Sequence, residues 1–179
     1  MDRFLEEVVR KRNRTVEEIM YYLSLLLMVL TGVIGFFSLM TLFLPGGFNA
    51  VNAVSTVVLL GIALYLFFYR DKLRTEYEYT FTNGSLDFAM VFNNKKRKSL
   101  GSLNVAKVDA FGKVQSGSFH RHVSTPNVKQ LRWFLNREAE LYYFAYAKNG
   151  QKSMIVFEPS EEMVGYIKHY LPYGAHQEN

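Results

Sequence analysis

Apolar and small residues fill one continuous stretch of the chain, Ile19–Tyr69, and no charged residue or histidine interrupts it. Turn residues at Pro45–Asn49 divide the stretch into Ile19–Leu44 and Ala50–Tyr69. An α-helix rises about 1.5 Å per residue, so about 20 apolar residues cross a hydrocarbon core of about 30 Å. The pattern therefore predicts a transmembrane helical hairpin over residues 19–69, with spans of about 19–44 and 50–69.

Basic residues flank this stretch on both sides, whereas the turn between the two spans carries no charge. They are Arg10, Lys11, Arg12 and Arg14 before the stretch and Arg70, Lys72 and Arg74 after it. Basic flanks stay on the cytoplasmic side of a membrane. We therefore expect a two-span protein of the cell membrane with both termini in the cytoplasm.

Residues 1–18 form a short segment of mixed character before the first span. Phe4, Leu5, Val8 and Val9 recur at helical spacing among charged residues, which predicts a cytoplasmic amphipathic helix on the inner leaflet. A frayed basic tail is the alternative. The capping-box spacing of Thr15 and Glu18 predicts that Thr15 caps the first long helix.

Strict alternation of aromatic and polar residues begins at Glu76 and continues to Thr82. Asn83-Gly84 follows, and Leu86–Phe92 alternates again. Period-2 alternation indicates half-buried strands, and Asn-Gly between two such runs is a strong hairpin signal because both turn positions take positive φ. We therefore predict a β-hairpin here.

Further strands are expected at Lys95–Leu100, Val105–Phe111, Glu140–Ala147 and Lys152–Glu158. Residues 112–136 contain turn-forming Ser, Gly and Pro residues and show no clear period. Within them, apolar residues from Val128 to Leu135 fit a short helix, and Leu131–Leu135 fits a strand equally well.

The last clear element is a helix over residues 160–171. Ser160 suits the N-cap, Glu161 and Glu162 suit the first turn, and Pro172 ends the helix. Apolar residues at a 3.6-residue spacing give this helix one face that packs on a sheet. The expected fold class is α+β: a transmembrane hairpin over 19–69, then an antiparallel β half-barrel over residues 70–179 closed by the C-terminal helix.

Three segments carry a resemblance to known proteins: EYEYTFTNGSLDF (76–88), NKKRKSL (94–100) and FEPSEEMVGYIKHYLP (157–172). With the N-terminal MDRFLEEVV and the two spans, nearly the whole chain resembles a family of uncharacterised bacterial membrane proteins, mainly of anaerobic Gram-positive bacteria. The order of elements resembles the pleckstrin-homology-like (PH-like) fold. The resemblance implies this architecture for residues 70–179 and implies no activity.

Charge is concentrated in the expected soluble domain. Residues 70–179 carry 16 Lys/Arg and 11 Asp/Glu, so the net charge of +5 belongs to this part of the chain. A basic excess beside an anionic inner leaflet favours contact with the membrane surface, and we expect no nucleic-acid partner. The chain has no cysteine, which excludes disulfides and thiol chemistry.

The densest basic cluster predicts the candidate site, a contact with anionic lipid headgroups. Its residues are Lys95, Lys96, Arg97 and Lys98, together with Lys72 and Arg74 beside the second span. Each basic residue near an anionic surface contributes about 1 kcal/mol to binding. The alternative is a solvated turn whose charges protect an edge strand. Phosphoinositide-binding proteins of the PH-like fold resemble one another in a long basic loop between the first two strands. Here that connection is the short turn Asn83-Gly84, which has no basic residue, so the resemblance does not imply specific phosphoinositide recognition.

Catalytic and metal-binding signatures are missing from the sequence. His120-Arg121-His122 offers two imidazoles, but no cysteine or clustered carboxylate accompanies it, so an exposed loop is expected there and no metal or cofactor. We therefore expect no enzyme. The sequence favours a membrane-anchored PH-like binding module that contacts a protein or anionic lipid; the alternative is an accessory subunit that joins a larger membrane complex through its spans.

Overall fold

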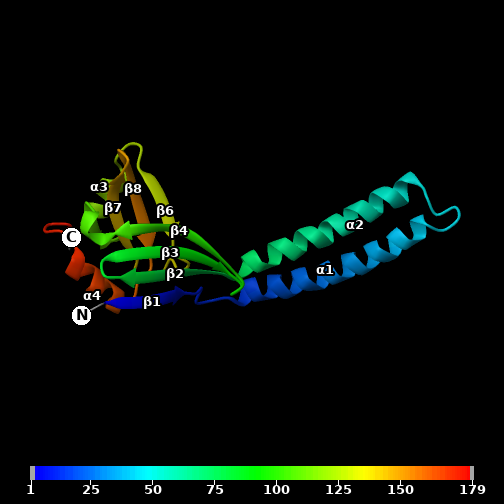
Figure 1. The fold of residues 1–179 in the computed structure, drawn as a ribbon, viewed down its shortest axis with the longest axis horizontal. Coiled ribbons are helices and arrows are strands. Elements are labelled where there is room, and N and C mark those ends of the chain that lie inside the picture. Colours follow the sequence, from blue (N-terminus) through cyan, green and yellow to red (C-terminus); the bar gives the residue numbers. More distant parts are fainter. Residues whose placement is uncertain (1–2, 178–179) are drawn as a thin grey trace. The chain divides into compact units, whose positions relative to one another are not determined.

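The computed structural model describes residues 3–177 of the 179-residue chain. Residues 1, 2, 178 and 179, which are the ends of the expected N-terminal segment and soluble domain, lie outside the described residues. The chain forms two compact units (Figure 1). A helical unit contains residues 13–75 and 92–95, and a sheet domain contains residues 3–12, 76–91 and 96–177.

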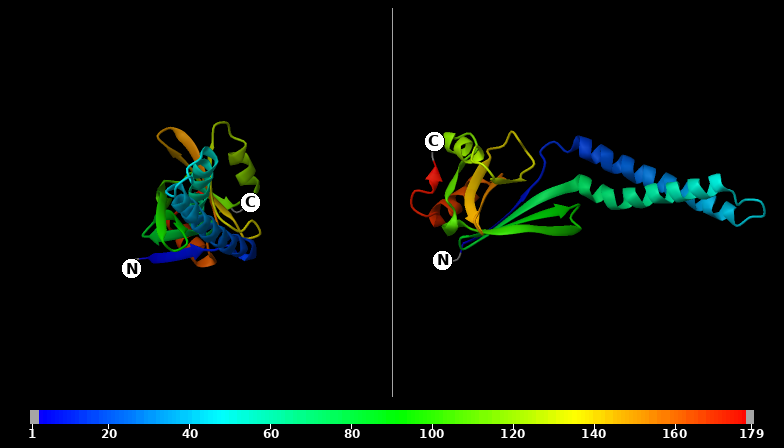
Figure 2. Two further views of the ribbon diagram at one scale, coloured as in Figure 1. Left: turned by 90° about the vertical axis from the view of Figure 1, so that its right-hand side faces the viewer. Right: turned by 90° about the horizontal axis from the view of Figure 1, so that it is seen from above.

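Two long helices make up most of the helical unit, α1 (Thr15–Leu42) and α2 (Ala50–Tyr69), and they lie side by side (Figures 1 and 2). Both are long and apolar enough to cross a membrane, as the uncharged stretch predicts. The helix α1 begins at Thr15, close to the start that the capping-box spacing predicts and four residues before the predicted span. The helix continues through Glu17 and Glu18, whereas the bounds of the span followed the apolar stretch alone.

Small and hydroxyl residues pack at the seam between α1 and α2. Ser38 and Thr56 share a hydrogen bond of 2.6 Å between their hydroxyl oxygens. A Cβ added to Gly35 would lie 2.9 Å from the Leu60 side chain, so only glycine permits this close approach. Asn52 donates to the Gly47 carbonyl in the connecting turn. The pair is therefore held by polar contacts as well as by apolar packing.

The capping-box prediction for α1 is wrong. The N-cap residue is Arg14, whose side chain makes no cap hydrogen bond, and the Thr15 N–H donates to the Asn13 carboxamide. Glu18 pairs with Arg74 instead of reaching back to the N-cap. A long-range ion pair thus replaces the local contact that the spacing predicts.

A five-residue 3₁₀-helix, η1 (Arg70–Arg74), follows α2 directly and leads into the first sheet. That sheet has the order β1-β2-β3-β4. Its strands are β1 (Phe4–Val9), β2 (Thr75–Thr82), β3 (Ser85–Phe92) and β4 (Lys96–Asn104). The β2–β3 hairpin turns at Asn83 and Gly84, whose φ values of 46° and 88° are both positive as predicted.

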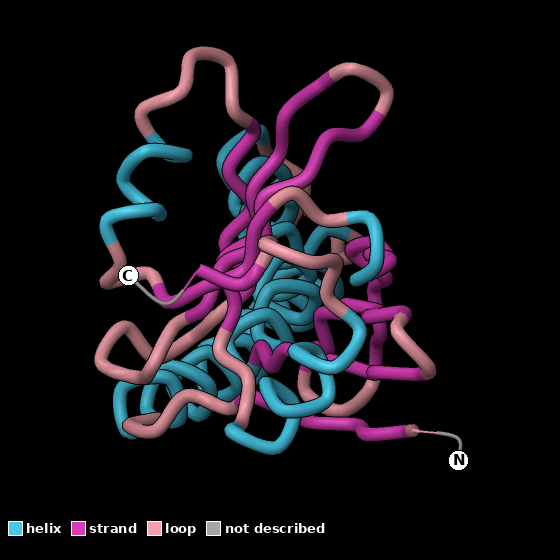
Figure 3. Tube along the Cα trace, turned by 90° about the vertical axis from the view of Figure 1, so that its left-hand side faces the viewer, coloured by secondary structure: helices cyan, strands magenta, loops and turns pink. Residues whose placement is uncertain are grey.

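The N-terminal segment is a strand, so both the predicted amphipathic helix and the frayed tail are wrong for residues 4–9. β1 pairs antiparallel with β2, with Leu5 opposite Phe81 and Val9 opposite Tyr77. Leu5 and Val9 pack against the core, whereas Phe4 stays largely exposed. Figure 3 shows the strand that follows the N-terminus in magenta. The segment therefore belongs to the sheet domain, and the two long helices are inserted between paired strands.

The second sheet has the order β6-β8-β7-β5-β9. Its strands are β5 (Ala110–Lys113), β6 (Lys129–Trp133), β7 (Tyr142–Lys148), β8 (Gln151–Phe157) and β9 (His176–Gln177). β6 pairs parallel with β8, and β9 pairs parallel with β5, so the sheet is mixed. The strand alternative for the Val128–Leu135 region is thus the observed one, shifted toward its N-terminal end.

Two short helices replace structure that was predicted otherwise. Val105–Lys107 is a 3₁₀-helix, η2, because the Asn104 side chain accepts the Ala106 N–H, and the strand expected at Val105–Phe111 begins only at Ala110. Gly117–Val123 is helix α3, which lies in the stretch without clear period.

The C-terminal helix α4 (Glu161–Tyr170) has Ser160 as its N-cap, and the Ser160 hydroxyl accepts the Met163 N–H as expected. Met163, Val164 and Ile167 are buried in the main core with the aromatic residues of β2, β3 and β8. This helix closes the half-barrel. The expected α+β architecture of two long apolar helices, antiparallel strand pairs and a C-terminal helix is therefore confirmed.

Candidate functional site

The turn between β3 and β4 carries the start of the predicted basic cluster. Asn93 and Asn94 adopt positive φ values of 49° and 54°, which asparagine tolerates better than most residues. The Asn93 carboxamide donates to the Asp71 carboxylate over 2.8 Å, and its N–H donates to the Arg74 carbonyl over 2.8 Å. The turn is therefore fastened to η1, and both belong to the helical unit.

Three of the predicted site residues come together through these contacts. Lys95 lies in the fastened turn, and Lys72 and Arg74 lie in η1 directly after α2. Lys72 and Lys95 are exposed. Positive charges from two parts of the chain therefore lie together where the apolar helix α2 ends. Lys95 follows Lys72 and Arg74 by more than 20 residues, so the sequence alone does not reveal this arrangement.

Arg74 has a structural role within this group. Its guanidinium forms an ion pair with the Glu18 carboxylate and lies 3.7 Å from the centroid of the Tyr21 ring. A guanidinium over an aromatic face is held by cation–π attraction as well as by charge. Arg74 thus ties η1 to the start of α1, and its charge is already neutralised.

The other three predicted residues, Lys96, Arg97 and Lys98, begin strand β4 and are all exposed. Arg97 pairs with the Glu78 carboxylate on β2. Glu78 is only 7% exposed, and burial raises its pKa, with the nearby Glu6 adding to the rise and Arg97 opposing it. Arg97 therefore compensates a buried carboxylate, while Lys96 and Lys98 project from the opposite face of the strand.

His120-Arg121-His122 lies on helix α3, so the prediction of a loop is wrong, whereas His120 and Arg121 are exposed as predicted. Phe119 packs edge-on to Tyr143 with ring centroids 5.3 Å apart, and His122 lies 5.9 Å from the same ring. The helix forms because its apolar side covers Tyr143. Among residues 3–177 no group of three or more His, Cys, Asp or Glu side chains could hold a metal ion.

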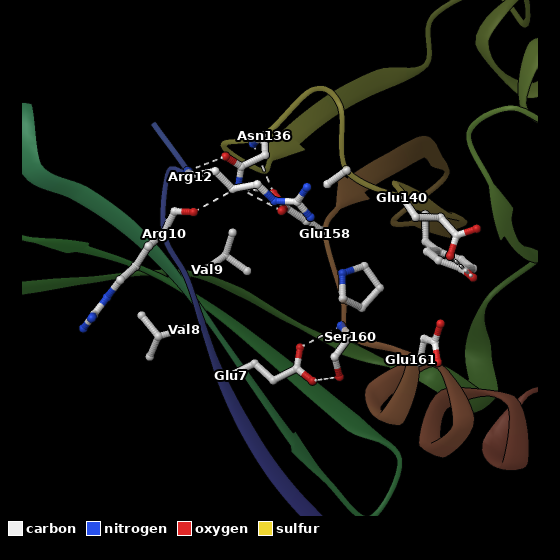
Figure 4. Close-up of a pocket in the computed structure, with 13 residues that line it drawn as sticks. Glu7, Val8, Val9, Arg10, Arg12, Asn136, Glu140, Glu158, Ser160 and Glu161 are labelled. Carbon is white, nitrogen blue, oxygen red and sulfur yellow. Dashed lines mark hydrogen bonds between the residues drawn. The ribbon is translucent and has the colours of Figure 1, made fainter. Parts of the chain in front are cut away.

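A cleft of about 520 Å³ lies along β1, between this strand, the end of β8 and the start of α4 (Figure 4). Glu7 points toward α4, where its carboxylate accepts hydrogen bonds from the Ser160 N–H and hydroxyl. Glu7 is charged and lies on the core-facing side of β1. Its carboxylate is nevertheless paired, because it binds Ser160, the N-cap residue of α4.

Asn136 holds the end of the N-terminal segment at the other side of this cleft. Its carboxamide donates to the Arg10 carbonyl over 2.9 Å and accepts the Arg12 N–H over 2.7 Å (Figure 4). One side chain thus pairs with the backbone as a neighbouring strand would. Glu158 orients it by accepting from both its backbone N–H and its side-chain amide. We call Asn136 and Glu158 the N-terminal clamp.

The clamp is anchored in the core by Tyr79. The Tyr79 hydroxyl is fully buried, donates to the Trp133 carbonyl and accepts the Glu158 N–H over 3.3 Å. Burial raises the pKa of Tyr79. The hydrogen bonds run from the core to the backbone of Arg10 and Arg12, so they hold the end of the N-terminal segment to the sheet domain.

Three carboxylates that line the cleft have partners within the domain. Besides Glu7 and Glu158, Glu140 pairs with Lys113, whose hydrogen bond lowers the pKa of Glu140. A general acid or base works from a free, correctly poised group, and these groups are occupied. Sequence reasoning missed Glu7, Asn136 and Glu158 because residues more than 100 positions apart meet here and no local spacing marks them.

A family model describes residues 1–176 as Bacterial PH-like domain (DUF6106), and the chain belongs to this family. The match includes both long apolar helices, so they are part of the family's architecture. No curated protein and no solved structure matches the chain. The resemblance noted from the sequence is thus confirmed, and the function of the family is not established.

Proposed function

We propose that this bacterial PH-like protein is a binding module anchored in the cell membrane by α1 and α2, with both termini and the sheet domain in the cytoplasm. The pairing of β1 with β2 supports this topology. Strands of one sheet lie on the same side of a membrane, so an even number of spans separates them. The basic flanks of the two helices favour the cytoplasmic side.

Cysteine labelling tests the topology in this cysteine-free chain. Phe48→Cys places a thiol in the exposed turn between α1 and α2, and Tyr173→Cys places one on the exposed end of the sheet domain. We expect an impermeant thiol reagent to label whole cells at position 48 only. Labelling at position 173 with position 48 protected would reverse the orientation.

The second part of the proposal is that the basic turn contacts anionic headgroups of the inner leaflet. One observation carries it: Asn93 fastens the turn of Lys95 to Asp71 and Arg74, immediately after the apolar helix α2. If α2 spans the bilayer, Lys72 and Lys95 lie at its cytoplasmic face. Lys96 and Lys98 follow directly along the chain, while Arg74 and Arg97 serve the internal ion pairs.

Amine reactivity in lipid nanodiscs tests this contact with the whole chain. We expect a water-soluble acetylating reagent to modify Lys95 and Lys98 more slowly in anionic than in zwitterionic nanodiscs. The exposed Lys107 and Lys152 serve as internal controls. The protection should vanish in 1 M salt, where the Debye length falls from about 10 Å at 0.1 M to about 3 Å. Equal rates in both lipids would mean that these lysines are solvated and do not contact the headgroups.

PH-like domains are generally non-catalytic, and we propose no catalytic activity for this one. The alternative, an accessory subunit that assembles through its spans, requires a helix face suited to a partner. The small and hydroxyl residues Gly35, Ser38 and Thr56 are used within the α1–α2 pair. Replacing the pair by an unrelated two-span anchor should therefore leave a binding partner attached, whereas an accessory subunit would lose it.

A further inference from the structure

The two sheets of the domain end in strands that have no neighbour on their outer side. Among residues 3–177, β4 ends the first sheet and β6 ends the second. A cavity of about 310 Å³ lies between these two strands, on the inner face of the second sheet. We call this cavity the β4–β6 groove. It is separate from the basic turn and from the cleft along β1.

The groove combines apolar side chains with polar and basic ones. Leu131 and Trp133 of β6 and Leu100 of β4 line it, as do Lys129 and Lys148. No Asp or Glu of the described residues lines it, and its remaining lining is largely neutral and polar. An occupant that matches this surface presents carboxylates to the two lysines and apolar side chains to Leu100 and Leu131.

The strand geometry favours an extended peptide as the occupant. Lys129, Leu131 and Trp133 alternate along β6, so they face the groove at every second position. The outer edge of β6 offers backbone N–H and C=O groups to an added strand. Opposite it, Gly101 of β4 has no side chain, and a Cβ there would lie 3.9 Å from Trp133. Glycine at such a position permits close approach of another backbone.

We propose that the β4–β6 groove binds an acidic, extended segment of a partner protein, which adds a strand to β6. On the side of the added strand that faces the groove, which holds every second residue, acidic side chains contact Lys129 and Lys148 and apolar side chains cover Leu131 and Leu100. This inference gives the proposed binding module a protein partner and in that respect rests on the proposed function. The competing explanation is that the lysines only protect the strand edge from pairing.

The test uses the whole chain in uncharged detergent micelles. The probe is a ten-residue peptide in which Glu and Val take turns at every second position with Ser between them, so that both residue types face the groove on one side of the strand. The signal is the fluorescence of Trp133, the only tryptophan of the chain. We expect saturable binding with a shift in the emission. The same peptide with alternate residues N-methylated keeps its charge but loses the N–H donors of one edge, and should bind at least tenfold more weakly.

Matched protein variants separate the groove from general attraction. The variant K129Q/K148Q should bind the acidic peptide at least tenfold more weakly, whereas K107Q/K152Q removes equal charge outside the groove and should bind as the wild type does. Equal binding of the methylated peptide, or an equal loss in both variants, would overturn the proposal. Because these micelles contain no anionic lipid, either outcome is independent of the headgroup contact.

Discussion

The two outer strands of the first sheet, β1 and β4, have very different surroundings. β1 and the residues after it are held to the domain by side-chain hydrogen bonds: Glu7 of β1 contacts the cap of α4, and Asn136 contacts the backbone of Arg10 and Arg12. β4 borders the β4–β6 groove, and its exposed beginning is Lys96–Lys98. One edge is closed by hydrogen bonds, and the other is open and basic.

The difference separates an edge that serves the fold from one that we propose is available for a partner. The closed edge lies in the segment that leads into α1, so the chain enters and leaves the helical unit through two adjacent strands, β1 and β2. The hydrogen bonds of Glu7 and Asn136 hold this segment to the sheet domain. The open edge borders the groove in which we propose that a peptide adds a strand to β6.

Removal of β1 should produce the largest loss. A chain of residues 70–179 alone lacks Leu5 and Val9, which pack on the core, and lacks the contacts of Glu7 and the clamp. Two half-buried side chains and these hydrogen bonds together contribute about 4 kcal/mol. We expect this fragment to unfold at a much lower urea concentration than the sheet domain in the whole chain, followed by Trp133 fluorescence.

A bypass of the helical pair provides the control for this prediction. Residues 1–12 joined to residues 75–179 by a short glycine-rich loop keep β1 beside β2. This chain should recover most of the lost stability, because only the connection between paired strands changes. If the fragment without β1 were as stable as the bypassed chain, the closed edge would contribute nothing to the fold.

Gly84 and Gly150 lie in two hairpin turns of similar backbone geometry, of which the first packs against α4 and the second is open. Gly84 and Gly150 both follow an asparagine in a hairpin turn and have φ values of 88° and 78°. A Cβ at Gly84 would lie 2.7 Å from the Tyr170 ring of α4, whereas nothing lies within 4 Å of a Cβ at Gly150. Tyr170 in turn packs on Phe81.

Gly150→Ala should therefore cost about 1 kcal/mol from backbone strain alone, and Gly84→Ala about 2 kcal/mol or more because Tyr170 must also move. Gly84→Val should cost more again. Urea unfolding followed at Trp133 measures the difference between the two alanine variants. Equal losses would mean that α4 adapts to the turn without cost.

The N-terminal clamp should give an intermediate effect. Asn136→Ala removes two hydrogen bonds to the backbone of residues 10–12, and Glu158→Ala removes the groups that orient Asn136. Each change should cost about 1–2 kcal/mol, and the double variant should lose less than the sum. Strict additivity would show that Glu158 does not act through Asn136.

The parts predicted from the sequence are those with a regular local pattern. The two long helices, the hairpin at Asn83-Gly84 and helix α4 each carry a periodic or turn signal within their own residues. β1 does not: Phe4 and Leu5, then Val8 and Val9, are apolar in adjacent pairs, so each face of the strand is half apolar. The same pairs fit a helix, and only the pairing with β2 decides between the two.

The candidate sites were less predictable, because their geometry depends on long-range contacts. Charge density alone identified Lys95–Lys98, but it did not reveal that Asn93 fastens their turn to η1 or that Arg74 and Arg97 are engaged in ion pairs. The β4–β6 groove had no signal of its own. β6 lies in the stretch without clear period, and its position at the end of a sheet follows from its parallel pairing with β8.

The smallest expected effect concerns the buried Glu78 that Arg97 of the open strand compensates. The pKa of Glu78 is raised in the folded state above its ordinary value of 4.5, mainly by burial. The folded state then binds more protons than the unfolded state above that pH, so this carboxyl contributes stability below pH 4.5 that is lost as pH rises through the folded pKa.

Glu78→Gln removes this contribution, so the unfolding free energy of this variant should fall less than that of the wild type as pH rises from 4 to 7. Glu138→Gln, at an exposed position, should leave the wild-type pH profile unchanged. If Glu78→Gln followed the wild-type profile as well, the ion pair with Arg97 would balance the burial of the carboxylate, and β4 would be held to β2 more firmly than its open edge implies.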